Sequence, residues 1–387
     1  MPSADQPAGM ETGVSLAPLT TLGVGGRARW FVRATTVEDV VATHTWCRER
    51  AVPFSVIGGG SNLVVADEGV TGLVLQIAIG GIDFGRQGDA TVLRVGAGEP
   101  WDTVVAAAVS KGFQGVECLS GIPGSTGGTP VQNVGAYGQE VSDTIAQVTV
   151  LDRESGEVET LRGTDCRFGY RTSRFKSDDV GRFVVCEVTY ELRHAHPTVT
   201  YPDLVDLLER RGVGSPSVAD VRDAVLSIRR TKGMVLDASD PDTRSVGSFF
   251  MNPIVDARHH ARLASVAGGA PGFALPSDRI KVPAAWLIEH AGFSKGHGSA
   301  RLACLRSTRW RLSTGEEPLR MMSSLWPEES SSRSPIDLTS GSVRSRRSLG
   351  SAMMSMSRIC WTTRRLKPRR SGTVCRAHAS ACATARG

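Results

Sequence analysis

Ser248 lies in a segment whose composition suits proton transfer to a bound substrate. Residues 247–253 read Gly-Ser-Phe-Phe-Met-Asn-Pro, so glycine precedes the hydroxyl and two aromatic rings follow it. A serine is more often a helix cap or a hydrogen-bonded surface group. Ser248 does not stand in a Gly-x-Ser-x-Gly elbow, which argues against a serine hydrolase at this residue. We therefore interpret Ser248 as a candidate proton donor, a role that fits a reductase.

A basic and aromatic segment lies upstream, at residues 167–176. It reads Arg-Phe-Gly-Tyr-Arg-Thr-Ser-Arg-Phe-Lys and places four cations among three aromatic side chains. This composition suits an anionic or enolate-like ligand, which it would bind by charge and by stacking. A solvated basic surface is the alternative, and the residues alone leave both interpretations open. Arg229 and Lys232 add two cations farther along the chain.

Two glycine-rich segments precede these cations. Residues 58–62 read Gly-Gly-Gly-Ser-Asn and follow an apolar stretch, so backbone N–H groups could approach an anion without interference from Cβ atoms. Residues 121–138 contain six glycines and two prolines together with hydroxyl and amide side chains. A tight turn and a structural Ω-loop are the alternatives for the two segments. Together they predict a cradle for a phosphate and a polar heterocycle such as flavin.

The elements that carry these groups follow from local patterns. A strand at 28–33 leads into a helix that begins at Thr35 or Thr36, because each hydroxyl is followed three residues later by a carboxylate, Glu38 or Asp39. Further strands are predicted at 54–57, 72–77, 91–95, 146–152 and 182–192. The strand, helix and strand over residues 28–57 form a βαβ-like unit that ends in the loop at 58–62, and the stretch as a whole indicates an α+β fold.

Helices are predicted near both cation-bearing parts of the chain. One spans about 101–110, and an apolar stripe predicts another over 218–230, with Arg229 and Lys232 at its C-terminal end. Pro283 marks the start of a further helix that stops at Gly292. The segment around Ser248 reads as a loop that enters a strand.

Charge divides the chain into two parts. Residues 299–387 carry 17 basic and 5 acidic side chains, whereas residues 1–298 carry 28 basic and 34 acidic ones. The larger part is mildly acidic, which argues against nucleic-acid binding by the folded body. A chain of 387 residues with 40% hydrophobic content can bury a sizeable core and form two or three domains.

Cysteine spacing and hydropathy argue against several further classes of protein. Eight cysteines occur without a Cys-x-x-Cys pair, so neither a zinc site nor a disulfide framework is predicted. Residues 1–20 lack the pattern of a signal peptide, and no run of about 18 apolar residues occurs. We expect a soluble, cytoplasmic protein that is not bound to a membrane and holds no metal.

These motifs closely resemble the UDP-N-acetylenolpyruvoylglucosamine reductase family. The resemblance covers about residues 14–297, and the motifs follow the family's order. The matching segments are residues 20–26, 58–62, 121–138, 167–176, 247–253 and 281–293.

The resemblance implies a domain organisation and a reaction. It implies an α+β fold with a two-part FAD-binding unit of the vanillyl-alcohol-oxidase type at 14–75 and 76–200, a substrate-binding domain at 201–298, and an atypical Arg/Ser-rich tail at 299–387. Non-covalent FAD and the hydride donor NADPH are implied as cofactors. The implied reaction is reduction of UDP-N-acetylglucosamine enolpyruvate to UDP-N-acetylmuramate in peptidoglycan precursor synthesis. A small UDP-sugar is thus the expected partner, and nucleic acid is not; a monomer is expected.

The resemblance also assigns roles to residues. It implies that Ser248 donates the proton and that Arg171 stabilises the enolate-like intermediate. Substrate-binding residues implied in the same way are Tyr170, Tyr201, Arg229, Lys232 and Asn252. Cofactor-binding residues implied in the same way are Gly58, Gly59, Gly60, Ser61, Asn62, Gly121, Pro123, Gly124, Ser125, Gly127, Asn133, Gly135, Ala136 and Tyr137.

The end of the chain departs from the family. The family's catalytic glutamate has no assigned counterpart here, since Glu317 and Glu328 both follow too soon after Gly298. Residues 299–387 contain 18 serines and 16 arginines without a helical or strand period, which resembles translation in an altered reading frame. Two alternatives therefore stay open: a catalytically impaired flavin- or sugar-nucleotide-binding relic, and a nucleic-acid-associated protein that uses its Arg/Ser tail.

Overall fold

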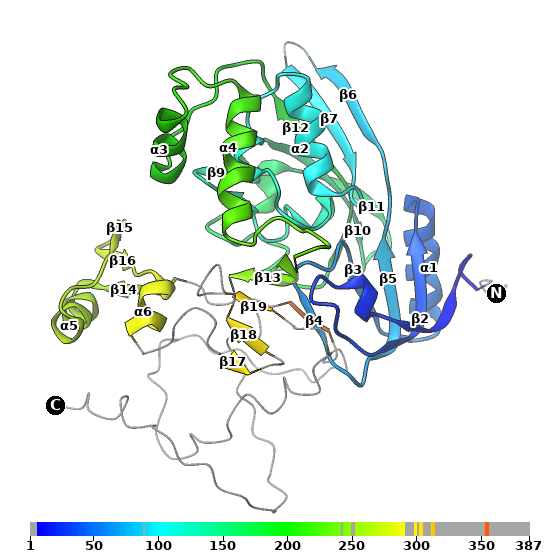
Figure 1. The fold of residues 1–387 in the computed structure, drawn as a ribbon. Helices are drawn as coiled ribbons and strands as arrows, with labels where there is room; N and C mark the ends of the chain where they lie inside the picture. Colours follow the sequence, from blue (N-terminus) through cyan, green and yellow to red (C-terminus); the bar gives the residue numbers. More distant parts are fainter. Residues whose placement is uncertain are drawn as a thin grey trace, which may run out of the picture.

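The computed structural model describes residues 6–87, 90–240, 243–248 and 252–290, together with short strands at 298–299, 302–304, 311–313 and 353–355 (Figure 1). Two sheets and the helices that cover them form the main body. A smaller unit follows at residues 252–290. The Glu317 and Glu328 positions discussed above lie outside the described residues.

The first sheet has the strand order β1-β2-β5-β3. Its strands are β1 (Glu11–Ser15), β2 (Arg27–Ala34), β3 (Phe54–Ile57) and β5 (Val70–Ile77). Strands β2, β5 and β3 are parallel, and β1 pairs antiparallel with β2. Helix α1 (Val37–Glu49) begins after Thr36, whose Oγ1 accepts the Asp39 N–H at 3.1 Å while Asp39 Oδ2 accepts the Thr36 N–H at 3.0 Å. This capping box confirms the predicted helix start.

The second sheet is antiparallel throughout and has the order β11-β10-β12-β7-β6. Its strands are β6 (Ile82–Gln87), β7 (Ala90–Gly96), β10 (Ile145–Asp152), β11 (Val158–Arg162) and β12 (Phe183–Leu192). Helix α2 (Trp101–Ser110) lies at the predicted residues, and Trp101 is fully buried against Tyr190 with 5.5 Å between ring centroids. One apolar core runs through both sheets, so the two halves of the body are held together by shared burial.

Two further helices carry part of the candidate site. Helix α4 (Val218–Thr231) confirms the predicted helix and is capped by Ser217. Helix α3 (Pro202–Arg210) was not predicted; it packs on α4 through buried leucines and valines. Figure 1 shows α2 and α4 side by side, and residue contacts between the two helices agree. The C-terminal end of α4 therefore approaches the loop that follows α2.

The unit at residues 252–290 is a small three-stranded sheet with two helices. Its strands run in the order β14-β16-β15. Its elements are β14 (Ile254–Asp256), α5 (Ala257–Ala267), β15 (Phe273–Leu275), β16 (Arg279–Lys281) and α6 (Ala284–His290). Helix α6 follows Pro283 as predicted, whereas the predicted stop at Gly292 lies outside the described residues.

The segment around Ser248, predicted as a loop that enters a strand, contains a strand. Ser248 is the last residue of strand β13 (Ser245–Ser248), which pairs antiparallel with β19. The remaining short strands are β4 (Leu63–Val65), β8 (Gly135–Ala136), β9 (Gln139–Glu140), β17 (Gly298–Ser299), β18 (Leu302–Cys304), β19 (Arg311–Ser313) and β20 (Met353–Ser355).

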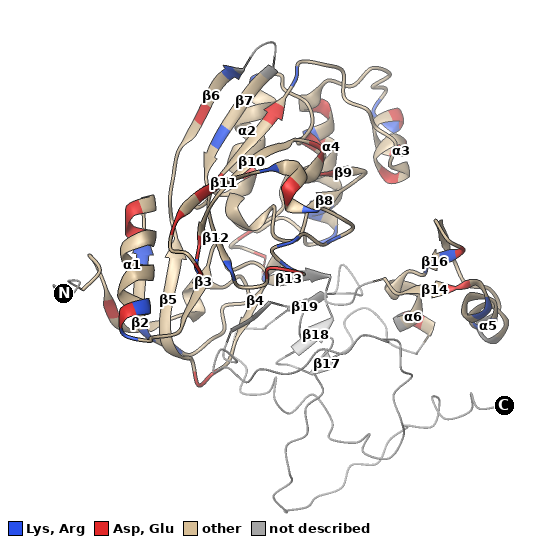
Figure 2. Cartoon of the chain, turned by 180° about the vertical axis from the view of Figure 1, so that it is seen from behind, with Lys and Arg blue, Asp and Glu red and all other residues tan. Residues whose placement is uncertain are grey.

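Surface charge is mixed over the main body. Figure 2 shows basic and acidic residues interspersed along α1, α3 and the outer strands. Within the described ranges, no helix combines the length and the apolar character needed to cross a membrane. The domain boundaries at 75, 200 and 298 stay predictions.

Candidate functional site

The two glycine-rich segments meet face to face. The Gly59 N–H donates to Ser125 Oγ at 3.2 Å, and Ser61 Oγ donates to the Pro123 carbonyl at 3.1 Å. A Cβ on Gly59 would lie 2.8 Å from the Cα of Gly124, and the φ angle of Gly124 is +114°. Glycine is therefore needed where the loops touch, because a side chain would force them apart.

Several backbone N–H groups beside this contact have no protein partner among the described residues. Across the described part of the chain, the N–H groups of Gly60, Ser61, Asn62, Gly124 and Ser125 donate to no protein acceptor. Successive free N–H groups in a glycine-rich turn bind anions, and a diphosphate is the anion that a dinucleotide cofactor presents. The residues thus fit the diphosphate of FAD.

Asn133 and Gly127, two of the residues predicted to bind the cofactor, make hydrogen bonds to other residues of the protein. The Asn133 side chain is 1% exposed; its Nδ2 donates to Glu140 Oε2 at 2.6 Å and to the Gly169 carbonyl at 3.1 Å, and its Oδ1 accepts the Ser142 N–H. The Gly127 N–H donates to the Ala97 carbonyl at 2.8 Å. Both residues fix the shape of the loop, and their cofactor contacts stay a prediction.

Helix α4 delivers a buried cation to the start of the second glycine-rich segment. Arg229 is 6% exposed, and its Nη2 donates to the carbonyls of Gly121 at 3.2 Å and Met234 at 3.0 Å. Its Nε is buried and has no partner among the described residues. Burial lowers the pKa of Arg229, and the nearby Tyr137 and Asp102 oppose that shift. A buried guanidinium with spare donor capacity is suited to an anionic ligand.

Tyr137 and Tyr201 stand beside this cation. Their rings are T-shaped, with 5.2 Å between centroids, and Tyr137 adopts a positive φ of 50° at the tip of the β8–β9 hairpin. Burial raises the pKa of Tyr137, while Arg229 and Lys232 oppose the shift. Lys232 Nζ lies 3.0 Å from Asp203 Oδ2, which ties the end of α4 to the start of α3. The predicted residues Tyr137, Tyr201, Arg229 and Lys232 are therefore neighbours.

Arg171 reaches the same hairpin from the basic segment. Its Nη2 donates to the Gly135 carbonyl at 2.6 Å, and its own carbonyl accepts from Lys176 Nζ at 2.9 Å. Burial lowers the pKa of Lys176, and the charge of Arg171 lowers it further. Arg171 also acts electrostatically on Arg229. These cations form one positive cluster, which favours a ligand with several negative charges.

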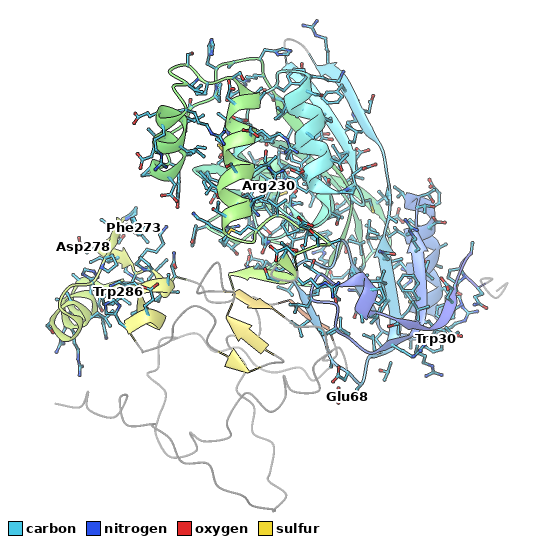
Figure 3. All side chains as sticks on the ribbon, in the orientation of Figure 1. Trp30, Glu68, Arg230, Phe273, Asp278 and Trp286 are labelled. Atoms are coloured by element: carbon cyan, nitrogen blue, oxygen red, sulfur yellow. The ribbon has the colours of Figure 1, made fainter. Side chains whose placement is uncertain are left out.

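Tyr170 contacts the smaller unit. Its side chain is 48% exposed, and Lys281 Nζ lies 4.7 Å from the centroid of its ring and 5.6 Å from that of Phe273. Figure 3 shows Phe273 and Trp286 in this unit, and Arg230 near the C-terminal end of α4. Residues 252–290 thus bring an additional cation toward the basic segment.

The last two predicted residues, Ser248 and Asn252, flank residues 249–251, which lie outside the described ranges. Ser248 ends β13, where it pairs with Arg311 of β19. Asn252 Oδ1 accepts the Ala284 N–H at 2.9 Å and so caps α6. Their roles toward a substrate stay predictions.

Sequence reasoning missed several residues of the site. Asp102, Arg222 and Lys281 contact residues of the predicted site, although none of the three was predicted to belong to it. Lys176 was already counted among the four cations of residues 167–176, and Lys281 begins a segment that carried the resemblance, so its charge was an available signal. Asp102 and Arg222 gave none, because a carboxylate and a guanidinium on amphipathic helices are usually solvated.

The chain is similar to known proteins over most of its length. Residues 28–162 match a family described as FAD binding domain. Curated proteins named UDP-N-acetylenolpyruvoylglucosamine reductase are similar along most of their length. The protein from Thermobifida fusca (strain YX) is 47% identical over 296 residues, which is 74% of this chain and 83% of that protein. The protein from Streptomyces coelicolor is 46% identical over 294 residues, 73% and 76% of the two chains.

A solved structure shares the fold. The crystal structure of UDP-N-acetylenolpyruvylglucosamine reductase from Thermus caldophilus superposes with a TM-score of 0.52 at 23% identity and covers 80% of this chain and 90% of that one. The match confirms the predicted α+β fold, and the matched FAD-binding family confirms that the main body contains a unit of that kind.

Proposed function

This chain belongs to the UDP-N-acetylenolpyruvoylglucosamine reductase family, and on that premise we propose that it reduces UDP-N-acetylglucosamine enolpyruvate to UDP-N-acetylmuramate for peptidoglycan synthesis. FAD is the bound cofactor and NADPH the hydride donor in this proposal. The observation that carries it is the peptide of Gly121, which begins the proposed cofactor loop and whose carbonyl accepts from the buried Arg229 of the cation cluster. In this proposal the residues that hold the cofactor therefore lie beside those that bind the substrate.

The N–H groups at 60–62 and 124–125, which have no acceptor within the described part of the chain, would hold the diphosphate of FAD by charge-assisted hydrogen bonds. Bound FAD would supply hydride transfer from NADPH to the methylene carbon of the enolpyruvyl group. The chain's part is to place that carbon beside the flavin and to exclude water. Tyr137 and Tyr201, whose rings contact each other beside Arg229, would cover a bound sugar in this proposal.

The positive cluster would offset the charge that develops during the reaction. Hydride addition to the methylene carbon leaves an electron pair on the adjacent carbon, delocalised into the substrate carboxylate. Arg171, anchored to the Gly135 carbonyl, and Arg229 are the cations proposed to stabilise it. Ser248 would then give a proton to that carbon, a transfer that an alcohol can make because the intermediate is a strong base.

Purified full-length chain tests the proposal directly. The protein should carry flavin absorbance and should oxidise NADPH only when the enolpyruvyl UDP-sugar is present, with UDP-N-acetylmuramate as product. Ser248→Ala should lower kcat by about 10²- to 10⁴-fold while FAD stays bound. Undiminished turnover by that variant would remove Ser248 from the mechanism.

A second candidate is a flavin- or sugar-nucleotide-binding relic without turnover. The observation that favours it is the sequence after Gly298, in which no glutamate matches the family's catalytic one. Stoichiometric FAD and UDP-sugar binding with no NADPH oxidation would select this candidate. Failure to bind either ligand would contradict both.

A further inference from the structure

Gly121, the first residue of the proposed cofactor loop, is hydrogen-bonded through both its N–H and its carbonyl. Its N–H donates to Asp102 Oδ1 at 2.6 Å, and its carbonyl accepts from Arg229 Nη2 at 3.2 Å. Its φ angle is +69°, and a Cβ there would lie 2.8 Å from Leu226 Cδ2. Gly121 thus has little freedom to move without disturbing either partner.

Asp102 also joins two helices. Its carboxylate accepts a bidentate pair from Arg222 of α4, with Nη1 to Oδ1 at 2.7 Å and Nη2 to Oδ2 at 2.9 Å. Bidentate arginine–carboxylate pairs are directional, so they fix orientation as well as distance. The Arg222 side chain is 17% exposed and that of Asp102 is 41% exposed. Asp102 Oδ1 therefore serves the Gly121 N–H and the guanidinium together.

The pair acts on the same helix that supplies Arg229. Arg222 and Arg229 are seven residues apart, which is two helical turns, so both lie on one face of α4. Arg222 fixes that face to α2, and Arg229 then meets the Gly121 carbonyl and the neighbourhood of Tyr137. One carboxylate thereby sets the position of the loop and of the cation.

Asp102 supplies charge as well as geometry. Arg229 hydrogen-bonds to two carbonyls, and Asp102 is a carboxylate that acts on it electrostatically. Burial raises the pKa of Asp102, but hydrogen bonds from Arg222 and Gly121 outweigh it, so the pKa lies below its ordinary value and the group is ionised at neutral pH. A buried cation is costly without such compensation.

We propose that Asp102 is a positioning residue that couples the two halves of the site: it holds Gly121 for the cofactor and, through Arg222, holds Arg229 for the substrate. The coupling rests on the proposed function. A simple helix-to-helix ion pair is the competing explanation. If Asp102 is a positioning residue, its hydrogen bond with the Gly121 N–H contributes to FAD affinity. If it is only part of an ion pair between helices, that hydrogen bond contributes nothing.

Binding measurements on three variants separate these explanations. Asp102→Ala removes both the bridge and the acceptor, Arg222→Ala removes the bridge alone, and the swap Asp102→Arg/Arg222→Asp restores a bridge but leaves the Gly121 N–H facing a side chain without an acceptor. FAD affinity is measured by titrating flavin-free protein and following flavin fluorescence. UDP-sugar affinity is measured by calorimetry, so neither readout requires turnover.

We expect Asp102→Ala to weaken FAD binding by at least about tenfold and Arg222→Ala to weaken it less, because a lost charge-assisted hydrogen bond adds to the lost bridge. All variants that break the pair should weaken UDP-sugar binding. The swap should recover the melting temperature but not the FAD affinity. Arg211→Ala is the matched control. Arg211, at the end of α3, forms an ion pair with Asp223 of α4 at 2.8 Å, so its removal also breaks a bridge to α4 but one that does not involve Gly121.

Two results would overturn the proposal. One is FAD affinity of the swap equal to that of the unaltered chain, which would make Asp102 a bridge and nothing more. The other is equal weakening by Asp102→Ala and Arg222→Ala. Circular dichroism checks folding, and if Asp102→Ala does not fold, the swap and Arg222→Ala decide the question. If the unaltered chain shows no turnover but the FAD and UDP-sugar affinities of the variants follow the expected order, the proposed function is contradicted and the positioning role of Asp102 stands.

Discussion

Lys281 lies over the ring of Tyr170, with its Nζ 4.7 Å from the ring centroid. The lysine ends β16 of the smaller unit, and the tyrosine belongs to the basic segment at 167–176. A cation over the face of an aromatic ring is attracted by the ring quadrupole, and the attraction strengthens as water is excluded. The contact therefore connects residues 252–290 to the part of the body that carries Arg171.

This contact predicts a measurable coupling. We expect a double-mutant cycle with Lys281→Met and Tyr170→Leu to give a coupling free energy of about 0.5–2 kcal/mol, measured by urea unfolding. Lys281→Arg should keep most of it, because a guanidinium also stacks on an aromatic ring. Strictly additive losses for the two single variants would show that the contact contributes nothing.

Gly124 should be essential for cofactor binding. Alanine there would place Cβ 2.6 Å from Ser61 Oγ at a φ of +114°, and such backbone strain costs about 1–3 kcal/mol. We expect Gly124→Ala to weaken FAD binding by tenfold or more in a fluorescence titration. Gly128→Ala is the control in the same loop, since nothing lies within 4 Å of its added Cβ. Equal FAD affinities of the two variants would refute the contact between the loops.

The Asp152–Arg182 pair should make stability depend on pH. Asp152 is 4% exposed and accepts from Arg182 Nε at 3.0 Å. The hydrogen bond from Arg182 lowers the pKa of Asp152 below its ordinary value. The ionised carboxylate therefore stabilises the folded chain above pH of about 4, and this contribution is lost as pH falls through the lower, folded-state pKa.

Asp152→Asn tests this dependence, because the amide resembles the protonated acid at every pH. Urea unfolding at pH 7 should show the variant to be less stable than the unaltered chain. The difference should shrink steadily at pH values below 4. A difference that stays constant down to acid unfolding would mean that the pair does not control the titration.

Asn133 should contribute to the free energy of unfolding even when no cofactor is bound. Its buried amide makes three hydrogen bonds within the protein, so Asn133→Ala leaves several groups without partners. We expect a loss of about 2 kcal/mol or more in the free energy of unfolding, measured without FAD. Asn62→Ala, which removes a single hydrogen bond at 3.2 Å to Gln132, should cost less. The reverse order would reject a structural role for Asn133.

Local signals accounted for much of the secondary structure. The hydroxyl and carboxylate at Thr36 and Asp39 fixed the start of α1, and an apolar stripe located α4. Helix α5 was missed although Asp256 caps it and Gly268 ends it in a left-handed conformation. Ser248 was predicted to lie where a loop enters a strand, and only the pairing of β13 with β19 shows that it is the last residue of that strand.

The sequence by itself determined which segments carry the chemistry: the glycine-rich stretches and the clustered cations are local compositions that can be read directly. Only the tertiary structure decided how they meet. Ser61 and Pro123 are 62 residues apart, and Arg222 and Asp102 are 120 apart, yet each pair is hydrogen-bonded. Caps and periodic stripes act within a few residues, whereas such contacts depend on how two sheets and two helices pack around one core.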